Sequence, residues 1–216
     1  MPAQPLVVVL DHGPDDHAPL AEALTRAGAQ VEITSDKRTA LVADGLVIAG
    51  NGPFAEVIAG VLAVGGDQVV DRRLAGGRAV LAIGVGMHVM FAAGPGAEGL
   101  GEWPGVVDPV EPPGPVPVEV SDGSRLFAGL EDAEFAFEHA HAATTFPLLD
   151  DWPADTRLVV PVVTWSAGPA RFVAAVENGP LTALQLRPER SGDAGAQVLA
   201  RWVASLPAPA TPGDHA

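Results

Sequence analysis

The chain has 216 residues and a net charge of −15, and 48% of its residues are hydrophobic. An acidic surface repels phosphate backbones, which excludes nucleic acid as a partner, and no apolar run reaches the roughly 18 residues that cross a bilayer, which excludes a membrane protein. Cysteine is absent, which removes disulfides, thiolate metal ligands and cysteine nucleophiles from the available chemistry.

The first half of the chain alternates apolar runs with helical patterns. The run "PLVVVL" is continuously apolar, as is typical of a strand buried on both faces. The first helical pattern can be capped by Asp15 or Asp16 and ends at Gly28. Strands are predicted at 5–10, 30–34, 45–50 and 79–84, and helices at 15–29, 55–66, 67–77 and 86–94.

The second half of the chain has a different pattern. The proline-rich stretch 104–120 permits edge strand at best, and 135–142 alternates residue sizes like a strand. A closing amphipathic helix is predicted at 191–206, capped by Ser191 or Asp193. Strands of a smaller antiparallel or mixed sheet are predicted at 157–165, 170–179 and 181–186.

Together these patterns predict an α/β fold with a mainly parallel central sheet flanked by helices, plus a smaller antiparallel or mixed sheet. Residues 1–206 are expected to form a single domain, followed by a disordered tail at 207–216. The first apolar run lacks the basic flank and cleavage site of a signal peptide, so a cytoplasmic location is expected.

The segment Ala79–Phe91, "AVLAIGVGMHVMF", combines a buried strand, a glycine turn and the start of a helix. Nucleophile elbows of α/β enzymes have this arrangement, with a strained residue at positive φ between small neighbours. Gly84 stands at the strained position, flanked by Ala82 and Gly86. An ordinary glycine-rich turn fits the same pattern, so the spacing alone leaves both interpretations open.

The loop "AGNGPF" follows the third predicted strand. Gly50, Asn51 and Gly52 can present backbone N–H groups to an anion or oxyanion. The loop lacks the Gly-Lys-Ser/Thr ending of a Walker motif and the glycine spacing of a dinucleotide fingerprint. A tight turn is the alternative interpretation.

The motif "EHAH" places Glu138, His139 and His141 close together. On one strand, residues two apart share a face, and two histidines with a carboxylate could bind zinc. No third clear ligand follows at a characteristic spacing, so no metal is predicted, and polar residues facing a crevice are the favoured interpretation. Further histidines are available only if the fold brings them near: His12, His17 and His88.

Arg187 and Glu189 follow the last predicted strand, where open α/β sheets place their sites. Such charged side chains usually form a solvated ion pair, and this is the alternative interpretation of Arg187 and Glu189.

Taken in order, these segments resemble class I (triad) glutamine amidotransferases, and among them the glutaminase subunits of imidazole glycerol phosphate synthase. The similarity extends from about Leu6 to Leu206. "DGLVIAGNGPF" is similar to the oxyanion-loop segment of that family, "LAIGVGMHVMF" to its elbow, and "RPERSGDAGAQVLARWV" to its C-terminal part. The resemblance implies the flavodoxin-like α/β sandwich of these proteins.

The family hydrolyses glutamine with a Cys-His-Glu triad, and the resemblance places the triad on Gly84, Arg187 and Glu189. Glycine has no nucleophile, and arginine stays protonated and cannot act as a general base. The chain is therefore expected to be unable to hydrolyse glutamine through a thioester. The resemblance places the substrate-pocket and oxyanion positions on Gly50, Asn51, Gly52, Val85, His88 and His139.

Three functions are expected from this combination, none needing a cofactor. The favoured one is a non-catalytic partner of a cyclase-like (β/α)8 subunit, although "PPGPVPVEV" replaces the family segment near that partner. The second is an enzyme with new chemistry in the old crevice. The third is a small-molecule sensor in which Arg187 binds a carboxylate or phosphate. The residues of the second hypothesis are His88, His139, His141, Arg187 and Glu189.

Overall fold

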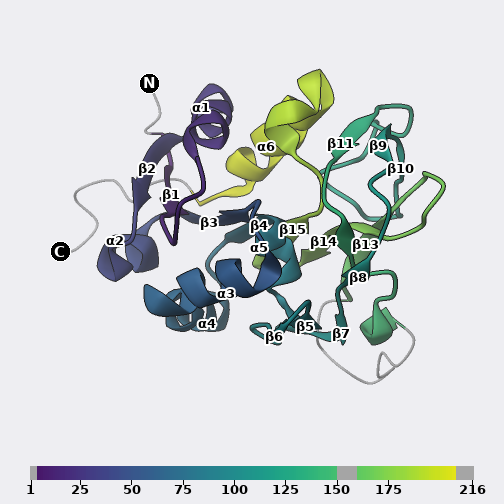
Figure 1. The fold of residues 1–216 in the computed structure, drawn as a ribbon. Coiled ribbons are helices and arrows are strands. Elements are labelled where there is room, and N and C mark those ends of the chain that lie inside the picture. Colours follow the sequence, from purple (N-terminus) through teal and green to yellow (C-terminus); the bar gives the residue numbers. More distant parts are fainter. Residues whose placement is uncertain (1–3, 150–159, 208–216) are drawn as a thin grey trace.

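The computed structural model describes residues 4–149 and 160–207, and an eight-stranded sheet forms its centre (Figure 1). The strand order is β10-β13-β14-β15-β4-β3-β1-β2. Neighbouring strands from β15 to β2 run parallel, and those from β10 to β15 are antiparallel. The strands are β1 (Leu6–Leu10), β2 (Gln30–Thr34), β3 (Gly45–Gly50), β4 (Val80–Gly84), β10 (Val118–Glu119), β13 (Val162–Ser166), β14 (Val173–Asn178) and β15 (Leu181–Leu184).

Three small sheets lie beside the antiparallel half of the central sheet, in the orders β11-β9, β12-β8 and β6-β5-β7. Their strands have only two to four residues each because proline and glycine interrupt the sequence there. They are β5 (Phe91–Gly94), β6 (Ala97–Glu98), β7 (Trp103–Val106), β8 (Asp108–Pro109), β9 (Gly114–Val116), β11 (Phe135–Phe137) and β12 (His141–Ala142).

Helices cover both faces of the central sheet, which explains the continuous apolar runs of its parallel strands. Val7 and Val9 of β1 face the core formed with α1 and α6. Val8 and Leu10 face the opposite core, formed with α2, α3 and α4. The helices are α1 (Ala18–Arg26), α2 (Lys37–Val42), α3 (Phe54–Ala63), α4 (Gly66–Ala75), α5 (Val85–His88) and α6 (Gly192–Ser205), with short 3-10 turns η1 (Pro147–Leu149) and η2 (Pro188–Arg190).

The predicted α/β architecture is confirmed, but the placement of the late strands was wrong. Strands β13, β14 and β15 extend the central sheet instead of forming a separate smaller one. The reason is that β15 pairs in parallel with β4, on the side of β4 opposite β3, and the antiparallel strands follow from it. The part of the predicted strand at 157–159 and the tail after Pro207 lie outside the described residues.

Two predicted elements end earlier than expected. The helix predicted at 86–94 stops at His88, and Phe91 begins strand β5, where its ring packs against those of Trp103 and Phe146 at 5.4 and 6.1 Å. The strand predicted at 135–142 is broken between β11 and β12, which pair with different strands. His139 lies in this break, so the expected strand face shared with His141 does not form.

Helix capping differs from the prediction in part. The N-cap of α1 is His17, which makes no side-chain cap, and Asp16, the residue before it, accepts a hydrogen bond from the N–H of Ala18; Ser191 likewise makes no side-chain cap for α6. Its hydroxyl instead donates to the carbonyl of Arg187 and accepts from the N–H of Ala136. Helix α2 was not predicted; it is six residues long and is capped by Asp36.

Arg73 of α4 is fully buried and ties together several turns at one end of the sheet. Its guanidinium replaces the water that loop carbonyls would otherwise need. Burial lowers the pKa of Arg73 to about 10, so the side chain still carries its charge at neutral pH. The backbone carbonyls that accept from it belong to Ala40, Leu41, Ala43, Asp44 and Ala79.

Candidate functional site

The carboxyl ends of β3 and β4 meet at the turn that the sequence predicts as an elbow. Gly50 pairs with Gly84 in the register of the two parallel strands. Gly84 has φ 61° and ψ −124°, a conformation that side chains disfavour, and α5 begins at the next residue, Val85. Strand, positive-φ residue and helix therefore follow one another as in an elbow, with glycine at the apex.

The space around this apex is already filled. A Cβ on residue 84 would lie 2.5 Å from Nε2 of His139 and 2.8 Å from the carbonyl oxygen of Gly50. A Cβ on Gly86 would collide with the carbonyl oxygen of Ile48. The glycine at 86 is thus required by the approach of two backbones, whereas at 84 a side chain fits only if the His139 ring turns away and the carbonyl of Gly50 shifts.

Two histidines lie next to each other close to the elbow. The ring centres of His88 and His139 are 5.6 Å apart, and His88 is fully enclosed. Nε2 of His88 donates to Oε1 of Gln185 at 2.6 Å, because the amide nitrogen of Gln185 is used by the carbonyl of His141 at 2.9 Å. His141 contacts Gln185 through its backbone carbonyl and not through its ring.

Burial keeps both rings neutral. It lowers the pKa of His88 to about 3, helped by the neighbouring His139. Burial also lowers the pKa of His139, and the cation of Arg187 adds to this effect, while Glu138 and Glu189 oppose it. Nε2 of His139 is buried and has no hydrogen-bond partner in the described part of the chain. It is a neutral polar atom aimed at the space above Gly84.

Arg187 and Glu189 form a network of four charged side chains with Glu138 and Arg190. Arg187 donates through Nε to Oε1 of Glu189 at 2.6 Å and approaches Glu138 at 3.4 Å, and Arg190 approaches the same Glu138 at 3.0 Å. Arg187 and Glu189 are largely enclosed, whereas Arg190 is exposed. Two guanidiniums facing two carboxylates make the network electrically neutral, and it is not the solvated pair of the alternative interpretation.

The glycine loop after β3 is held by the loop after β1. The carboxylate of Asp15 accepts from the backbone N–H of Asn51 at 3.1 Å, and Nε2 of His12 lies 2.7 Å from the carbonyl of Ala49. The rings of His12 and His17 are 5.6 Å apart, and burial is the main cause that lowers the pKa of His17. The N–H of Asn51 is therefore engaged within the protein.

The structure brings most of the predicted site residues to one end of the central sheet. Gly50, Gly84, His88 and His139 lie together, and Arg187 and Glu189 adjoin them. Gln185 was missed, although a polar residue within the apolar run "LTALQL" was a usable signal. Within residues 4–149 and 160–207, no group of three or more His, Asp or Glu side chains is placed to hold a metal ion.

His88 should make the stability of the protein fall with acidification. Its folded pKa of about 3 is below the ordinary 6.5, so its contribution is complete above pH 6.5 and is lost as pH falls toward 3. Between pH 7 and pH 5 the free energy of unfolding should drop by about 2 kcal/mol more in the wild type than in His88→Gln. Urea denaturation at each pH measures the difference, and parallel profiles would contradict it.

The chain was compared with known proteins, and no family model matches it. It is 46% identical over 213 residues to "Imidazole glycerol phosphate synthase subunit HisH" of Thermobifida fusca, covering 94% of this chain and all of the relative. The chain belongs to the HisH family. Members from Streptomyces avermitilis (47%, covering 93% of this chain and 96% of the relative) and Leifsonia xyli (48%, covering 93% and 98%) carry the same name.

Solved structures support the fold alone, because their sequences are far from that of this HisH family member. PurLQS from Thermotoga maritima has a TM-score of 0.67 at 14% identity, and the match covers 94% of this chain and 99% of the other. The glutaminase domain of Trypanosoma brucei CTPS has a TM-score of 0.63 at 14% identity, and the match covers 94% of both chains. The class I glutamine amidotransferase-like fold is thereby confirmed.

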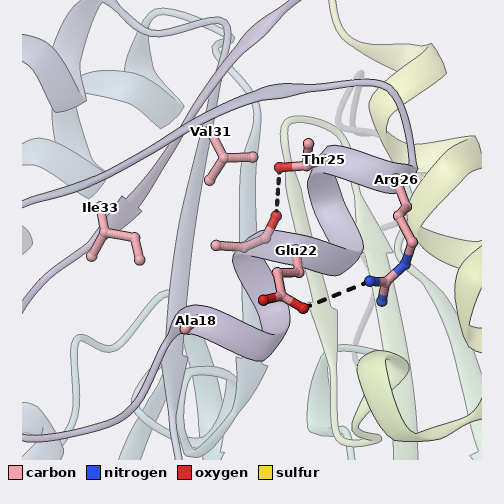
Figure 2. Close-up of a pocket in the computed structure, with 7 residues that line it drawn as sticks. Ala18, Glu22, Thr25, Arg26, Val31 and Ile33 are labelled. Carbon is pink, nitrogen blue, oxygen red and sulfur yellow. Dashed lines mark hydrogen bonds and ion pairs between the residues drawn. The ribbon is translucent and has the colours of Figure 1, made fainter.

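A separate hollow of about 600 Å³ lies between α1 and β2, away from the predicted site (Figure 2). Val31 and Ile33 line one side, and the Glu22–Arg26 ion pair lies on the other. Glu22 and Arg26 are exposed, and no catalytic constellation is present among the described residues there. In the same described part of the chain, no helix has both the length and the apolarity needed to span a membrane.

Proposed function

We propose that this chain takes the place of the glutaminase subunit beside a cyclase-like (β/α)8 partner without hydrolysing glutamine itself. The observation that carries this proposal is the glycine at the elbow apex in a chain with no cysteine at any position. A thioester needs a thiolate, and this chain has none to offer. The partner would then use free ammonia.

The position of the general base supports the same proposal. Arg187 stands there, and its guanidinium is held between Glu189 and Glu138. An arginine remains protonated in proteins, so it cannot take a proton from a nucleophile or return one to a leaving amine. Glu189 still orients the side chain at position 187, but an arginine there cannot relay a proton.

The glycine loop gives further support. An oxyanion is stabilised by N–H groups that are free to point at it. The N–H of Asn51 instead donates to the carboxylate of Asp15, so this donor is not free for a developing negative charge. Turning this N–H into the crevice would cost that hydrogen bond.

The partner is proposed from the relatives. Proteins 42–48% identical to this chain are named as subunits of imidazole glycerol phosphate synthase, and the similarity covers more than nine-tenths of this chain. The test is co-purification with the cyclase-like protein encoded in the same genome, followed by assays with glutamine and with ammonia. We expect a complex that turns over with ammonia and releases no glutamate. Glutamate release, or no complex at all, would refute the proposal.

A second function, acid–base chemistry in the crevice, is favoured by one observation. The buried Nε2 of His139 lacks a partner among the described residues and faces Gly84, as a base awaiting a substrate would. A panel of small amides and esters, assayed with the wild type and with His139→Ala, tests it. The sensor hypothesis has less support, because Arg187 already faces two carboxylates.

A further inference from the structure

A second groove lies at the amino ends of the parallel strands, at the opposite end of the sheet from Gly84. Two hollows of about 620 and 310 Å³ form it, and five residues line both of them. We call this the amino-end groove. The shared residues are Arg125, Gly179, Thr182, Trp202 and Ser205.

Three arginines from distant parts of the chain line the amino-end groove. Arg78 precedes β4, Arg125 follows β10, and Arg201 belongs to α6. Backbone carbonyls hold two of them in place. Arg78 donates through Nη2 to Val42 and Ala43 at 2.7 and 2.8 Å. Arg201 donates through Nη1 to Leu126 and Ala128, also at 2.7 and 2.8 Å.

None of these three guanidiniums has a carboxylate oxygen within 4.0 Å in the described ranges, although the chain has 27 acidic residues against 12 basic ones. Asp44 and Glu177 line the groove as well, and protein donors engage one oxygen of Asp44 and both oxygens of Glu177. Asp44 accepts from the N–H of Leu6, and Glu177 accepts from the hydroxyl of Ser124 and the N–H of Arg125. Among the described residues, the guanidinium of Arg125 itself makes no hydrogen bond or ion pair.

We propose that the amino-end groove binds the phosphate group of a small phosphorylated metabolite. Guanidinium forks match the oxygens of phosphate, and two of the three are fixed before a ligand arrives. A phosphate monoester carries close to two negative charges at neutral pH, which favours it over a single carboxylate. The combined hollow is of the size that holds a small molecule, with Trp202 and Thr182 in its wall.

The test uses the full chain, with inorganic phosphate as the probe. Phosphate binding is measured by calorimetric titration and by the shift in melting temperature. We expect one phosphate per chain, and roughly tenfold weaker binding in Arg125→Ala and Arg125→Gln, which lose a charged donor. Arg26→Ala removes the same charge from the hollow between α1 and β2 and should leave binding unchanged.

Three outcomes would overturn the proposal. Chloride at equal ionic strength could reproduce the effect of phosphate, which would make it general screening. The Arg125 variants could bind like the wild type. Glutamate could bind as tightly as phosphate, which would assign the groove to carboxylates. None of these outcomes depends on glutaminase activity, so the groove and the proposed function are tested separately.

Discussion

Gly84→Cys will leave glutamate release from glutamine at the level of the wild type. The new thiol finds no general base at position 187, since Arg187 is protonated and clamped by Glu189 and Glu138. Arg187 does not give up its proton, so it cannot protonate the departing ammonia either. The Cβ also requires the ring of His139 to turn away. The measurement is enzyme-coupled detection of glutamate, with and without the cyclase-like partner.

The double variant Gly84→Cys/Arg187→His supplies the two groups that the proposed function takes to be missing, with Glu189 beside position 187 to orient the imidazole. Its rate of glutamate release should exceed that of Gly84→Cys by roughly 10²-fold or more, because this is the usual contribution of a positioned acid–base group. Gly84→Ser/Arg187→His is the matched control, because it has the same bulk without the thiol and should stay inactive. Substantial glutamate release by Gly84→Cys alone would sink the assignment of Arg187.

Arg73→Met should lower the free energy of unfolding by about 3–5 kcal/mol, because several buried or half-buried carbonyls lose a hydrogen bond to a charged donor, at about 1–3 kcal/mol each. Methionine fills the volume but removes the guanidinium from five backbone carbonyls, of which, among the described residues, only those of Ala43 and Ala79 keep another donor, in Arg78 and the N–H of Leu46. The midpoint and slope of urea denaturation measure this loss.

The neighbouring Arg72→Met provides the control, because Arg72 is exposed and its loss should change stability by about 0.5 kcal/mol at most. Arg73→Lys keeps the charge with fewer donors and should be intermediate, which keeps the test informative if the methionine variant does not fold. Equal stability of Arg72→Met and Arg73→Met would contradict the role given to the network.

Local patterns were enough to predict the parallel half of the sheet. The apolar runs of β1, β3 and β4 are buried on both faces, so their composition alone indicates a central strand. The tight turn between β4 and α5 was predictable from Gly84 and Gly86 for a related reason. Positive φ at one and a close backbone approach at the other leave few alternatives to glycine.

Features that depend on long-range contacts were not predictable in the same way. The strands after residue 160 look like any short strands in sequence, and only pairing with β4 assigns them to the central sheet. The engagement of Asn51 by Asp15 joins two loops 36 positions apart. The five hydrogen bonds of Arg73 likewise depend on the directions of backbone carbonyls, which local sequence patterns do not reveal.

The position of β4 between β3 and β15 has a consequence for synthesis on the ribosome. Val80 pairs with Leu181, about 100 positions later, so the strand that carries the elbow lacks one neighbour until most of the chain has emerged. The nascent chain therefore exposes one long edge of β4, whose unpaired amides invite wrong partners. Final closure of the crevice is a late event that depends on the last quarter of the polypeptide.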